Sequence, residues 1–403
     1  MANLEIFDLA LLLLGAKTGG IIFHKLHQPS LAGELLAGIV LGSSILKLVN
    51  PSQIVEATSQ LGLMFLVLLT TLAIDWSKVE NKVESYSMIE IIMAIIVMVI
   101  TFFVGNLLKW NFFTSVVVAL AMMQSSLAIA SRTLANIGEL NSKEGEAIIG
   151  FQVVNDIVAI LSIAVVANFL QNSTLGVGTL AKMLFIVVGF VVVMSKTGLK
   201  FTIWLTDTVQ KHGLEDTLLG LTLVLSFSLA TFTEKLGLES FLGVFLAGLL
   251  LSKTPQASVI SGKVKEVGEA FFIPIFFASI GLGVDVMSAY QQLPFIISFA
   301  LFAIAIKMIS YAAPLAAFGY SGRESLRIGS GMVSVSEMSL IILSIGLAAN
   351  AFDVHVYSMM IAIFLIIDVV SPIITSMFFR DKNMPSYPKR SSRFGVLNKG
   401  FTR

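Results

Sequence analysis

"GELLAGIVLG" at Gly33–Gly42 and "GVFLAGLLLS" at Gly243–Ser252 are identical at five of ten positions and lie 210 residues apart. A second pair of segments has the same offset. "LGLMFLVLLTTLAID" ends at Asp75, and "FFIPIFFASIGLGVD" ends at Asp285. Leucine-rich segments often match by chance, but chance gives no reason for two matches to share one register. The constant offset therefore indicates an internal duplication.

The duplication extends to a third pair, "AMMQSS" at Ala121–Ser126 and "GMVSVS" at Gly331–Ser336, again 210 residues apart. Both members gather hydroxyl groups within an apolar region. We interpret them as candidates for helices that are interrupted within the membrane, because such breaks form the binding sites of many duplicated transporters. The alternative is that each Ser bonds to a carbonyl of its own helix.

The composition places the chain among polytopic membrane proteins. Of its 403 residues 56% are hydrophobic and 13% charged, and the mean hydropathy is +0.91, whereas soluble domains average about 25% charged residues. The absence of Cys excludes disulfides, thiolate metal sites and Cys nucleophiles. The four His lie near segment ends, so we expect no His-based metal or catalytic centre. We expect no cofactor, no nucleic-acid partner and no enzymatic activity.

Thirteen segments are apolar enough to cross a bilayer, which takes about 20 residues each. They are 5–25, 30–46, 56–75, 85–107, 112–134, 143–170, 176–205, 214–235, 239–253, 262–284, 291–319, 323–350 and 355–379. Of the 26 Lys and Arg residues, 20 fall in alternate loops and in the tail on one side of these spans. Basic residues accumulate on the cytoplasmic side, so we expect a protein of the cell membrane with its N-terminus outside and its C-terminus in the cytoplasm.

The offset of 210 residues covers seven predicted spans. Because seven is odd, the second copy enters the membrane from the opposite side. Six helices, one linker helix and six further helices form an all-α fold with an inverted-topology duplication. Such duplications characterise secondary transporters, whose binding sites lie near the middle of the membrane where the repeats meet.

Three ionisable side chains lie near the middle of predicted spans, namely Asp156, Lys307 and Glu337. At about 1.5 Å per residue, each is more than ~15 Å from the ends of its span. A charge at that depth costs at least ~2.5–3.5 kcal/mol and typically marks an ion or proton pathway. The alternative is a charge network that only holds helices together. Weaker candidates, which we expect at helix interfaces or near span ends, are Lys17, Glu34, Glu90, Glu239 and Asp368.

The three central charges suggest a chemistry. With Asp156 and Glu337 ionised and Lys307 protonated, the net charge is −1, and either one proton or one alkali cation neutralises it. The two ions would compete for Asp156, which is what an exchanger requires. A hard cation prefers several oxygen ligands. We expect these from Asp156 itself, from carbonyls at the helix breaks and from the side chains of Gln152, Asn155, Ser125, Ser126 and Ser336.

The two amides differ in their placement. Gln152 is four residues before Asp156 and shares its helix face. Asn155 lies about 100° round the helix from Asp156. Asn155 therefore either contributes to the ion site or braces the neighbouring helices by hydrogen bonds.

Six motifs make the chain resemble the monovalent cation:proton antiporters of the sodium/proton exchanger and Kef-type branch. In chain order they are "QPSLAGELLAGIVLG", "FLVLLTTLAID", "VVNDIVAI", "FFIPIFFASIGLGVD", "AIAIKMIS" and "GMVSVSEMSLI". The resemblance covers residues 1–379. It implies that Asp156 binds Na⁺ or K⁺ and the proton, that Lys307 pairs near it, and that the crossed broken helices lie around Ser125–Ser126 and Ser334–Glu337, including Ser336.

The family also implies a homodimer that works as an elevator. The scaffold and dimer surface would comprise ~1–80 and ~214–285, with ~176–205 as the linker helix. The ion-carrying core would comprise ~85–170 and ~291–379. Residues 380–403 form a basic tail, which we expect in the cytoplasm, where it either contacts anionic membrane lipid or serves as a positive-inside anchor.

Two departures from the family pattern bear on the transport cycle. Many sodium/proton members carry Asp-Asp where this chain has Asn155-Asp156, which favours one-for-one, electroneutral exchange. Lys307 is retained, however, and its own titration would move a second proton. There is no Gly-x-Gly-x-x-Gly unit after a strand, and only 24 residues follow the last span. We therefore expect no nucleotide-binding domain of the Kef kind.

Other functions stay open from the sequence alone. Na⁺ is favoured as the cation, and the main alternative is a K⁺/H⁺ antiporter or a K⁺ efflux transporter without the regulatory domain. An organic-solute symporter could share the inverted repeat. An intramembrane protease would need two facing carboxylates such as Asp156 and Asp368, but the Tyr-Asp and Gly-x-Gly-Asp contexts of such enzymes are absent.

Overall fold

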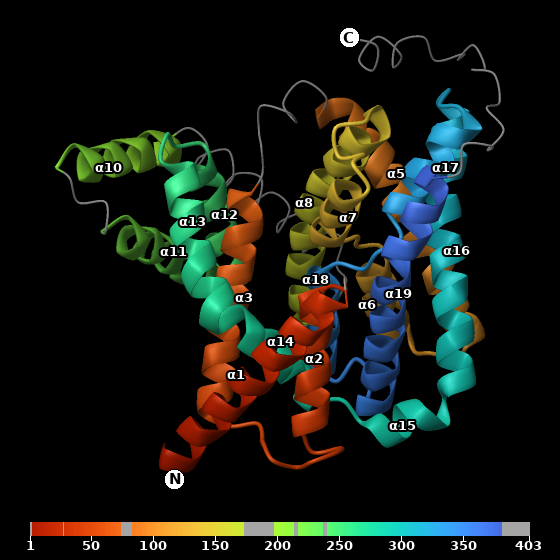
Figure 1. Cartoon of the computed structure of the whole chain (residues 1–403), viewed down its shortest axis with the longest axis horizontal. Coiled ribbons are helices and arrows are strands. Elements are labelled where there is room, and N and C mark those ends of the chain that lie inside the picture. Colours follow the sequence, from red (N-terminus) through yellow and green to blue (C-terminus); the bar gives the residue numbers. More distant parts are fainter. Residues whose placement is uncertain are drawn as a thin grey trace. The chain divides into compact units, whose positions relative to one another are not determined.

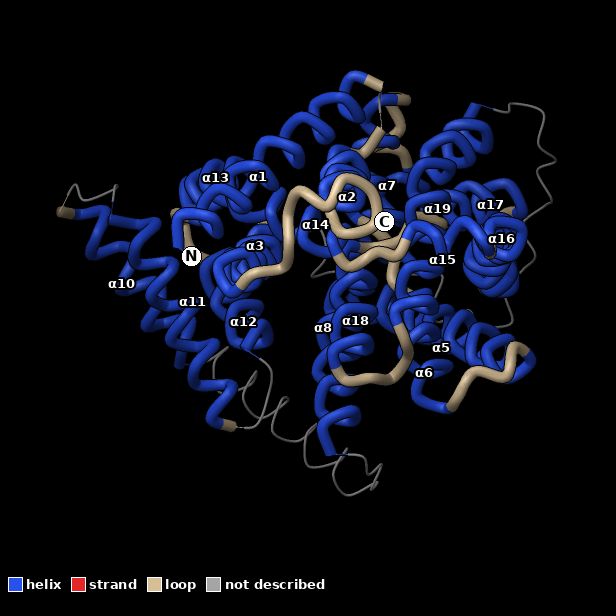
Figure 2. The backbone as a smooth tube through the Cα atoms, turned by 90° about the horizontal axis from the view of Figure 1, so that it is seen from below, coloured by secondary structure: helices blue, strands red, loops and turns tan. Residues whose placement is uncertain are grey.

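The structure, a computed structural model, describes residues 2–26, 28–73, 83–172, 197–212, 217–236 and 240–380. All regular secondary structure in these ranges is helical (Figures 1 and 2). Seven described segments are long and apolar enough to cross a bilayer, one of them the interrupted segment Phe112–Asn136, and three apolar helices are shorter. The predicted all-α membrane fold is confirmed, whereas the number of thirteen spans stays a prediction. Residues 176–196 of the predicted linker helix, Asp75, Glu239 and the basic tail after Arg380 lie outside the described residues.

The chain divides into two compact units. Unit 1 comprises Met1–Leu26, Gly33–Trp76 and Ala167–Gly283. Its helices are α1 (Ala2–Lys25), α2 (Ser30–Leu41, from Gly33 on), α3 (Gln53–Leu72), α10 (Leu199–Lys211), α11 (Thr217–Lys235), α12 (Ser240–Ser252), α13 (Ala257–Val267), the π-helical turn η2 (Gly268–Phe272) and α14 (Ile273–Leu282).

Unit 2 comprises His27–Ala32, Ser77–Val166 and Val284–Arg403. Its helices are α5 (Val83–Leu107), α6 (Phe112–Met122), α7 (Leu127–Asn136), α8 (Lys143–Asn172, up to Val166), α15 (Val286–Gln291), α16 (Leu293–Ala317), α17 (Gly322–Gly331), α18 (Glu337–Ala348) and α19 (Val354–Arg380). The roles of scaffold and ion-carrying core that the family implies for these segments stay predictions.

The repeated glycines of unit 1 lie where helix backbones touch. A Cβ atom on Gly33 would collide with the carbonyl group of Gly19 in α1. A Cβ atom on Gly243 would collide with that of Leu229 in α11, and Gly19 and Leu229 are themselves 210 residues apart. Small residues let membrane helices approach this closely. The repeated motif therefore encodes the same helix crossing in both halves of the duplication.

Unit 2 preserves the offset in the bounds of its helices. Helix α5 covers residues 83–107 and α16 covers 293–317, so both ends differ by 210. Helices α7 and α18 begin at Leu127 and Glu337, with the same difference. In the described chain, the predicted spans 112–134 and 323–350 are each divided into two helices by a non-helical segment.

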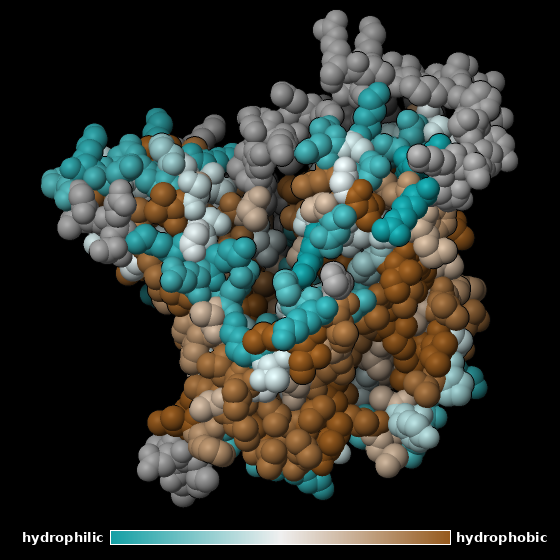
Figure 3. Space-filling view, in the orientation of Figure 1, coloured by the Kyte–Doolittle hydropathy of each residue, from teal (hydrophilic) through white to brown (hydrophobic). Residues whose placement is uncertain are grey.

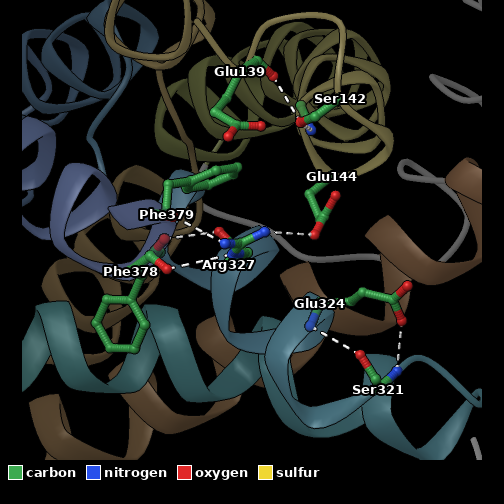
Figure 4. Close-up of polar contacts among 10 residues, drawn as sticks. Glu139, Ser142, Glu144, Ser321, Glu324, Arg327, Phe378 and Phe379 are labelled. Atoms are coloured by element: carbon green, nitrogen blue, oxygen red, sulfur yellow. Dashed lines mark hydrogen bonds and ion pairs between the residues drawn. The ribbon is translucent and has the colours of Figure 1, made fainter. Parts of the chain in front are cut away.

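A polar cluster joins three helix ends of unit 2 (Figure 4). Arg327 of α17 pairs with Glu144 of α8 at 3.1 Å and donates to the carbonyl groups of Phe378 and Phe379, which lie near the end of α19. Its guanidinium also lies 5.2 Å from the ring centre of Phe379. One side chain thus satisfies carbonyls that the end of a helix leaves without an intrahelical partner.

The surface differs in polarity from one part to another (Figure 3). In Figure 3 hydrophobic side chains cover the flanks of the long helices, whereas hydrophilic side chains gather over α10 and α13 and near the ends of α17. Exposed apolar residues on the flanks include Leu14 and Ile21 of α1 and Leu301 of α16. Exposed apolar side chains along a spanning helix are expected where lipid is the solvent.

Candidate functional site

The two helix breaks in unit 2 contact each other. Between α6 and α7 the segment Met123–Ser126 is not helical, and between α17 and α18 the same holds for Met332–Ser336. The hydroxyl of Ser125 donates to the carbonyl of Met332 at 2.7 Å, and the amide of Ser126 donates to the hydroxyl of Ser334 at 3.2 Å. The broken helices therefore cross at their breaks, as the family resemblance implies.

Each break is followed by a helix with a serine cap. Ser126 accepts from the amide of Ile129 at the start of α7, and Ser336 accepts from the amide of Met338 at the start of α18. Serine at this position satisfies one of the free amides of a helix start. The sequence pairs these two serines at the 210-residue offset, and the structure gives them the same role.

Lys307 of α16 occupies the crossing itself. Its side chain is fully buried, and its ammonium donates to the carbonyl of Gln124 at 2.6 Å and to the carbonyl of Ser334 at 2.7 Å. Gln124 and Ser334 are 210 residues apart, so one cation binds the equivalent carbonyl of both breaks. Carbonyl groups just past the end of a helix carry partial negative charge, which favours a cation there.

Asn155 braces the first break. Its amide oxygen accepts from the amide of Ser125 at 2.8 Å, and its nitrogen donates to the carboxyl group of Glu90 at 2.7 Å and to the carbonyl of Met123 at 3.3 Å. Tyr311 donates to the same oxygen of Glu90 at 2.8 Å. Of the two roles that the sequence left open for Asn155, these contacts favour the bracing one.

Asp156 lies beside this brace on α8. It is 3% exposed, and one of its carboxylate oxygens has no hydrogen-bond partner among the described residues. Both polar atoms of the buried Gln152, one turn earlier on the same helix, also lack a partner there. Buried polar atoms are almost always paired, so a group of unpaired ones suggests a site for an ion or for water.

Glu337 stands close to this group. It opens α18, is partly exposed and has one oxygen without a partner among the described residues. Its carboxyl group interacts with the side chain of Ser126 and electrostatically with Asp156. Oxygen atoms from α8 and from the start of α18 thus supply the kind of ligands that hard monovalent cations accept. No cluster of three or more His, Cys, Asp or Glu side chains suited to a metal ion is found in the described ranges.

The hydrogen bonds of Lys307 go to backbone carbonyl groups. Within the described part of the chain it forms no ion pair with Asp156, and its ammonium binds the two carbonyls instead. The carboxyl groups that interact electrostatically with Lys307 are those of Asp368 and Glu90. Asp368, on α19, accepts from the amide of Val335 at 2.8 Å.

Glu90 and Asp368 are thus residues of the crossing that the sequence treats only as weak candidates. Both are buried, at 0% and 6% exposure. For Asp368 a signal is present, because it lies near the middle of the predicted span 355–379 and so meets the depth criterion that selects Asp156. For Glu90 the signal is weaker, since it lies only five residues inside the predicted span 85–107.

Comparisons with known proteins agree with this geometry. The model of the family "Sodium/hydrogen exchanger, transmembrane" matches residues 10–381. The chain is 28% identical to the probable Na⁺/H⁺ antiporter GerT of Bacillus cereus, over 85% of this chain and 91% of that protein. It is 25% identical to the Na⁺/H⁺-K⁺ antiporter GerN of the same organism, over 91% of this chain and 94% of that protein.

Among solved structures, the sodium proton antiporter MjNhaP1 from Methanocaldococcus jannaschii at pH 8 is similar with a TM-score of 0.66. The match covers 93% of this chain and 98% of that chain at 15% sequence identity. A likeness at this identity supports the fold alone.

Proposed function

The chain belongs to the sodium/hydrogen exchanger family, and from that premise we propose that it exchanges Na⁺, in preference to K⁺, for H⁺ across the membrane. The family resemblance drawn from its motifs is confirmed. The chain is a multi-pass membrane protein with a helix crossing. In this proposal it acts as a cation/proton antiporter and not as an enzyme. It works in the cell membrane as a homodimer, with its N-terminus outside and its C-terminus in the cytoplasm.

One observation carries the proposal, namely the unpaired carboxylate oxygen of Asp156 beside the crossing. A buried ionised carboxylate without a partner is costly. Either a proton or an alkali cation removes this cost, and the two ions exclude each other at one carboxyl group. Gln152 and Glu337 are placed to add oxygens to the cation, while Asn155 and Lys307 hold the backbone of the breaks in position.

An elevator requires that the ion site move as a rigid body. The hydrogen bonds of the crossing support such a movement, because they join α6, α8, α16, α18 and α19 within unit 2. In the proposed cycle, unit 2 carries Asp156 with either a cation or a proton from one side of the membrane to the other. Unit 2 does not make this movement while Asp156 is charged and has no ion bound, because moving an uncompensated charge across the apolar barrier costs too much free energy.

The choice of cation has a second candidate. The relative GerN is by name a Na⁺/H⁺-K⁺ antiporter, so a K⁺/H⁺ antiporter is the alternative. Everted vesicles with an imposed pH gradient and a pH-sensitive dye distinguish the two. We expect Na⁺ to discharge the gradient at lower concentration than K⁺, with Li⁺ as the third member of the panel. Failure of all three cations across the accessible pH range would refute the proposed function.

We predict that exchange is electroneutral. The neighbour of Asp156 is the neutral Asn155, so a single carboxylate cycles between one cation and one proton. In proteoliposomes held at two membrane potentials, the exchange rate and the final cation gradient should not differ. If the carrier moved one net charge per cycle, the membrane potential would add about 2.3 kcal/mol per 100 mV to the free energy that drives exchange. A clear dependence of the final gradient on voltage would contradict one-for-one exchange.

A further inference from the structure

At the centre of each helix break, a single peptide group forms a side-chain hydrogen bond at its oxygen and another at its N–H. In the first break the Gln124–Ser125 peptide accepts from Lys307 at its oxygen and donates from its N–H to Asn155. In the second break the Ser334–Val335 peptide accepts from Lys307 at its oxygen and donates from its N–H to Asp368. The two peptides lie 210 residues apart and are held in the same manner.

The two arrangements differ in one respect, which is charge. The acceptor on α8 is a neutral amide, whereas the acceptor on α19 is a carboxyl group. An ammonium at the oxygen and a carboxylate at the N–H both polarise the peptide in the same direction, so each strengthens the bond made by the other. Lys307 and Asp368 are thereby coupled through the four atoms of one peptide unit.

Lys307 needs a counter-ion, because a fully buried ammonium without a compensating negative charge is strongly unfavourable. Asp156 is not suited to be this counter-ion, because an ion pair between Lys307 and Asp156 would compete with the binding of the transported cation. Glu90 interacts with Lys307 as well, but no hydrogen bond or shared peptide group joins the two side chains among the described residues; one oxygen of Glu90 accepts from Asn155 and Tyr311, and the other has no partner there. Asp368 reaches Lys307 most directly, through the Ser334–Val335 peptide.

We propose that Asp368 is the counter-ion of Lys307 and a positioning residue for transport, which leaves Asp156 free to bind the cation. The inference rests on the proposed exchange of a cation at Asp156. It assigns the compensating charge to α19, on the side of the second break. Without Asp368, the ammonium of Lys307 would act as an internal competitor for Asp156.

The test begins with Asp368→Asn, which removes the charge but retains an oxygen that accepts from Val335. We expect the KM for Na⁺ in proteoliposomes to rise about tenfold or more, equal to ~1.4 kcal/mol, with a smaller change in the rate at saturating Na⁺. The double variant Lys307→Gln with Asp368→Asn keeps a donor at the crossing but lacks the competing charge. It should bring the KM back toward that of the unmodified protein.

Ser371→Ala serves as the matched control. Ser371 is buried on α19 one turn after Asp368 and donates to the carbonyl of Asp368. Its replacement disturbs the same helix without changing a charge, so the KM should stay close to that of the unmodified protein. An unchanged KM in Asp368→Asn, or a double variant no better than that single variant, would overturn the counter-ion role.

A stability measurement keeps the inference testable apart from transport. The thermal unfolding of the purified single and double variants forms a double-mutant cycle. A charge pair predicts that the double variant loses less stability than the sum of the two single losses. Additive losses would refute the pairing even in a protein that transports normally. Failure of the unmodified protein to exchange any cation would instead refute the proposed function.

Discussion

Replacement of Asp156 by Asn is expected to abolish cation/proton exchange. Asn keeps the size of the side chain and an oxygen ligand, but it carries no charge and does not bind a proton in the physiological range. Because the Asn side chain binds no proton, the variant has no proton at this site to exchange for a cation. Proteoliposomes with the variant should discharge an imposed pH gradient no faster than liposomes without protein when Na⁺, K⁺ or Li⁺ is added.

Ser162→Ala is a suitable control for this variant. Ser162 is buried on α8, as Asp156 is, and its hydroxyl donates within the helix to the carbonyl of Val158. Its replacement should leave exchange close to that of the unmodified protein. Cation-dependent discharge of the gradient by Asp156→Asn would show that the exchanged proton is carried elsewhere, with Glu337 as the next carboxyl group to examine.

Replacement of Asn155 by Leu is expected to destabilise the protein most strongly. Leu is similar in size but leaves the amide of Ser125, the carbonyl of Met123 and one oxygen of Glu90 without the partner they have now. Each buried polar group left unpaired costs about 1–3 kcal/mol. Tyr311 still donates to Glu90, so we expect a total loss of about 3–5 kcal/mol, measured by thermal or denaturant unfolding of the purified protein.

The combination of Glu90→Gln with Asn155→Leu tests the cause of that loss. If the lost hydrogen bond from Asn155 to Glu90 contributes to it, the double variant should be less destabilised than the sum of the two single variants. A loss of under ~1 kcal/mol for Asn155→Leu would mean that the crossing repacks around the apolar side chain and that Asn155 is not a brace.

The sequence allowed much of the fold to be predicted because the duplication has a constant register. The repeated motifs predict an internal duplication, and the structure places the equivalent residues Gly33 and Gly243 each against a neighbouring helix backbone. The paired serine segments predict the two helix breaks, and the structure has them at Met123–Ser126 and Met332–Ser336. Helix ends were less predictable. The predicted span 30–46, for example, is the shorter helix Ser30–Leu41, since an apolar segment continues past the point where the backbone turns.

The sequence predicted the depth of the site in the membrane, but it did not predict which groups bind or compensate the charged side chains. Depth in a span selects Asp156 and Lys307, because any charge there must be compensated. It does not reveal which face of a helix a side chain occupies or which groups compensate it. The resemblance implies that Lys307 pairs near Asp156, and what it does not reveal is that the ammonium binds two carbonyl groups at the helix breaks. Such groups are invisible in a sequence, since every residue has a carbonyl and only the fold shows which ones lack a partner.

The most direct test of a single carboxylate shared by cation and proton is a competition measurement. Tracer Na⁺ uptake into proteoliposomes that contain a saturating concentration of unlabelled Na⁺ would be measured over a range of external Na⁺ concentrations, with equal pH on both sides, at several pH values. We predict that the apparent KM for Na⁺ rises as the pH falls while the rate at saturating Na⁺ stays constant, because protons and Na⁺ displace each other from Asp156. A KM independent of pH, with only the maximal rate changing, would contradict a shared site.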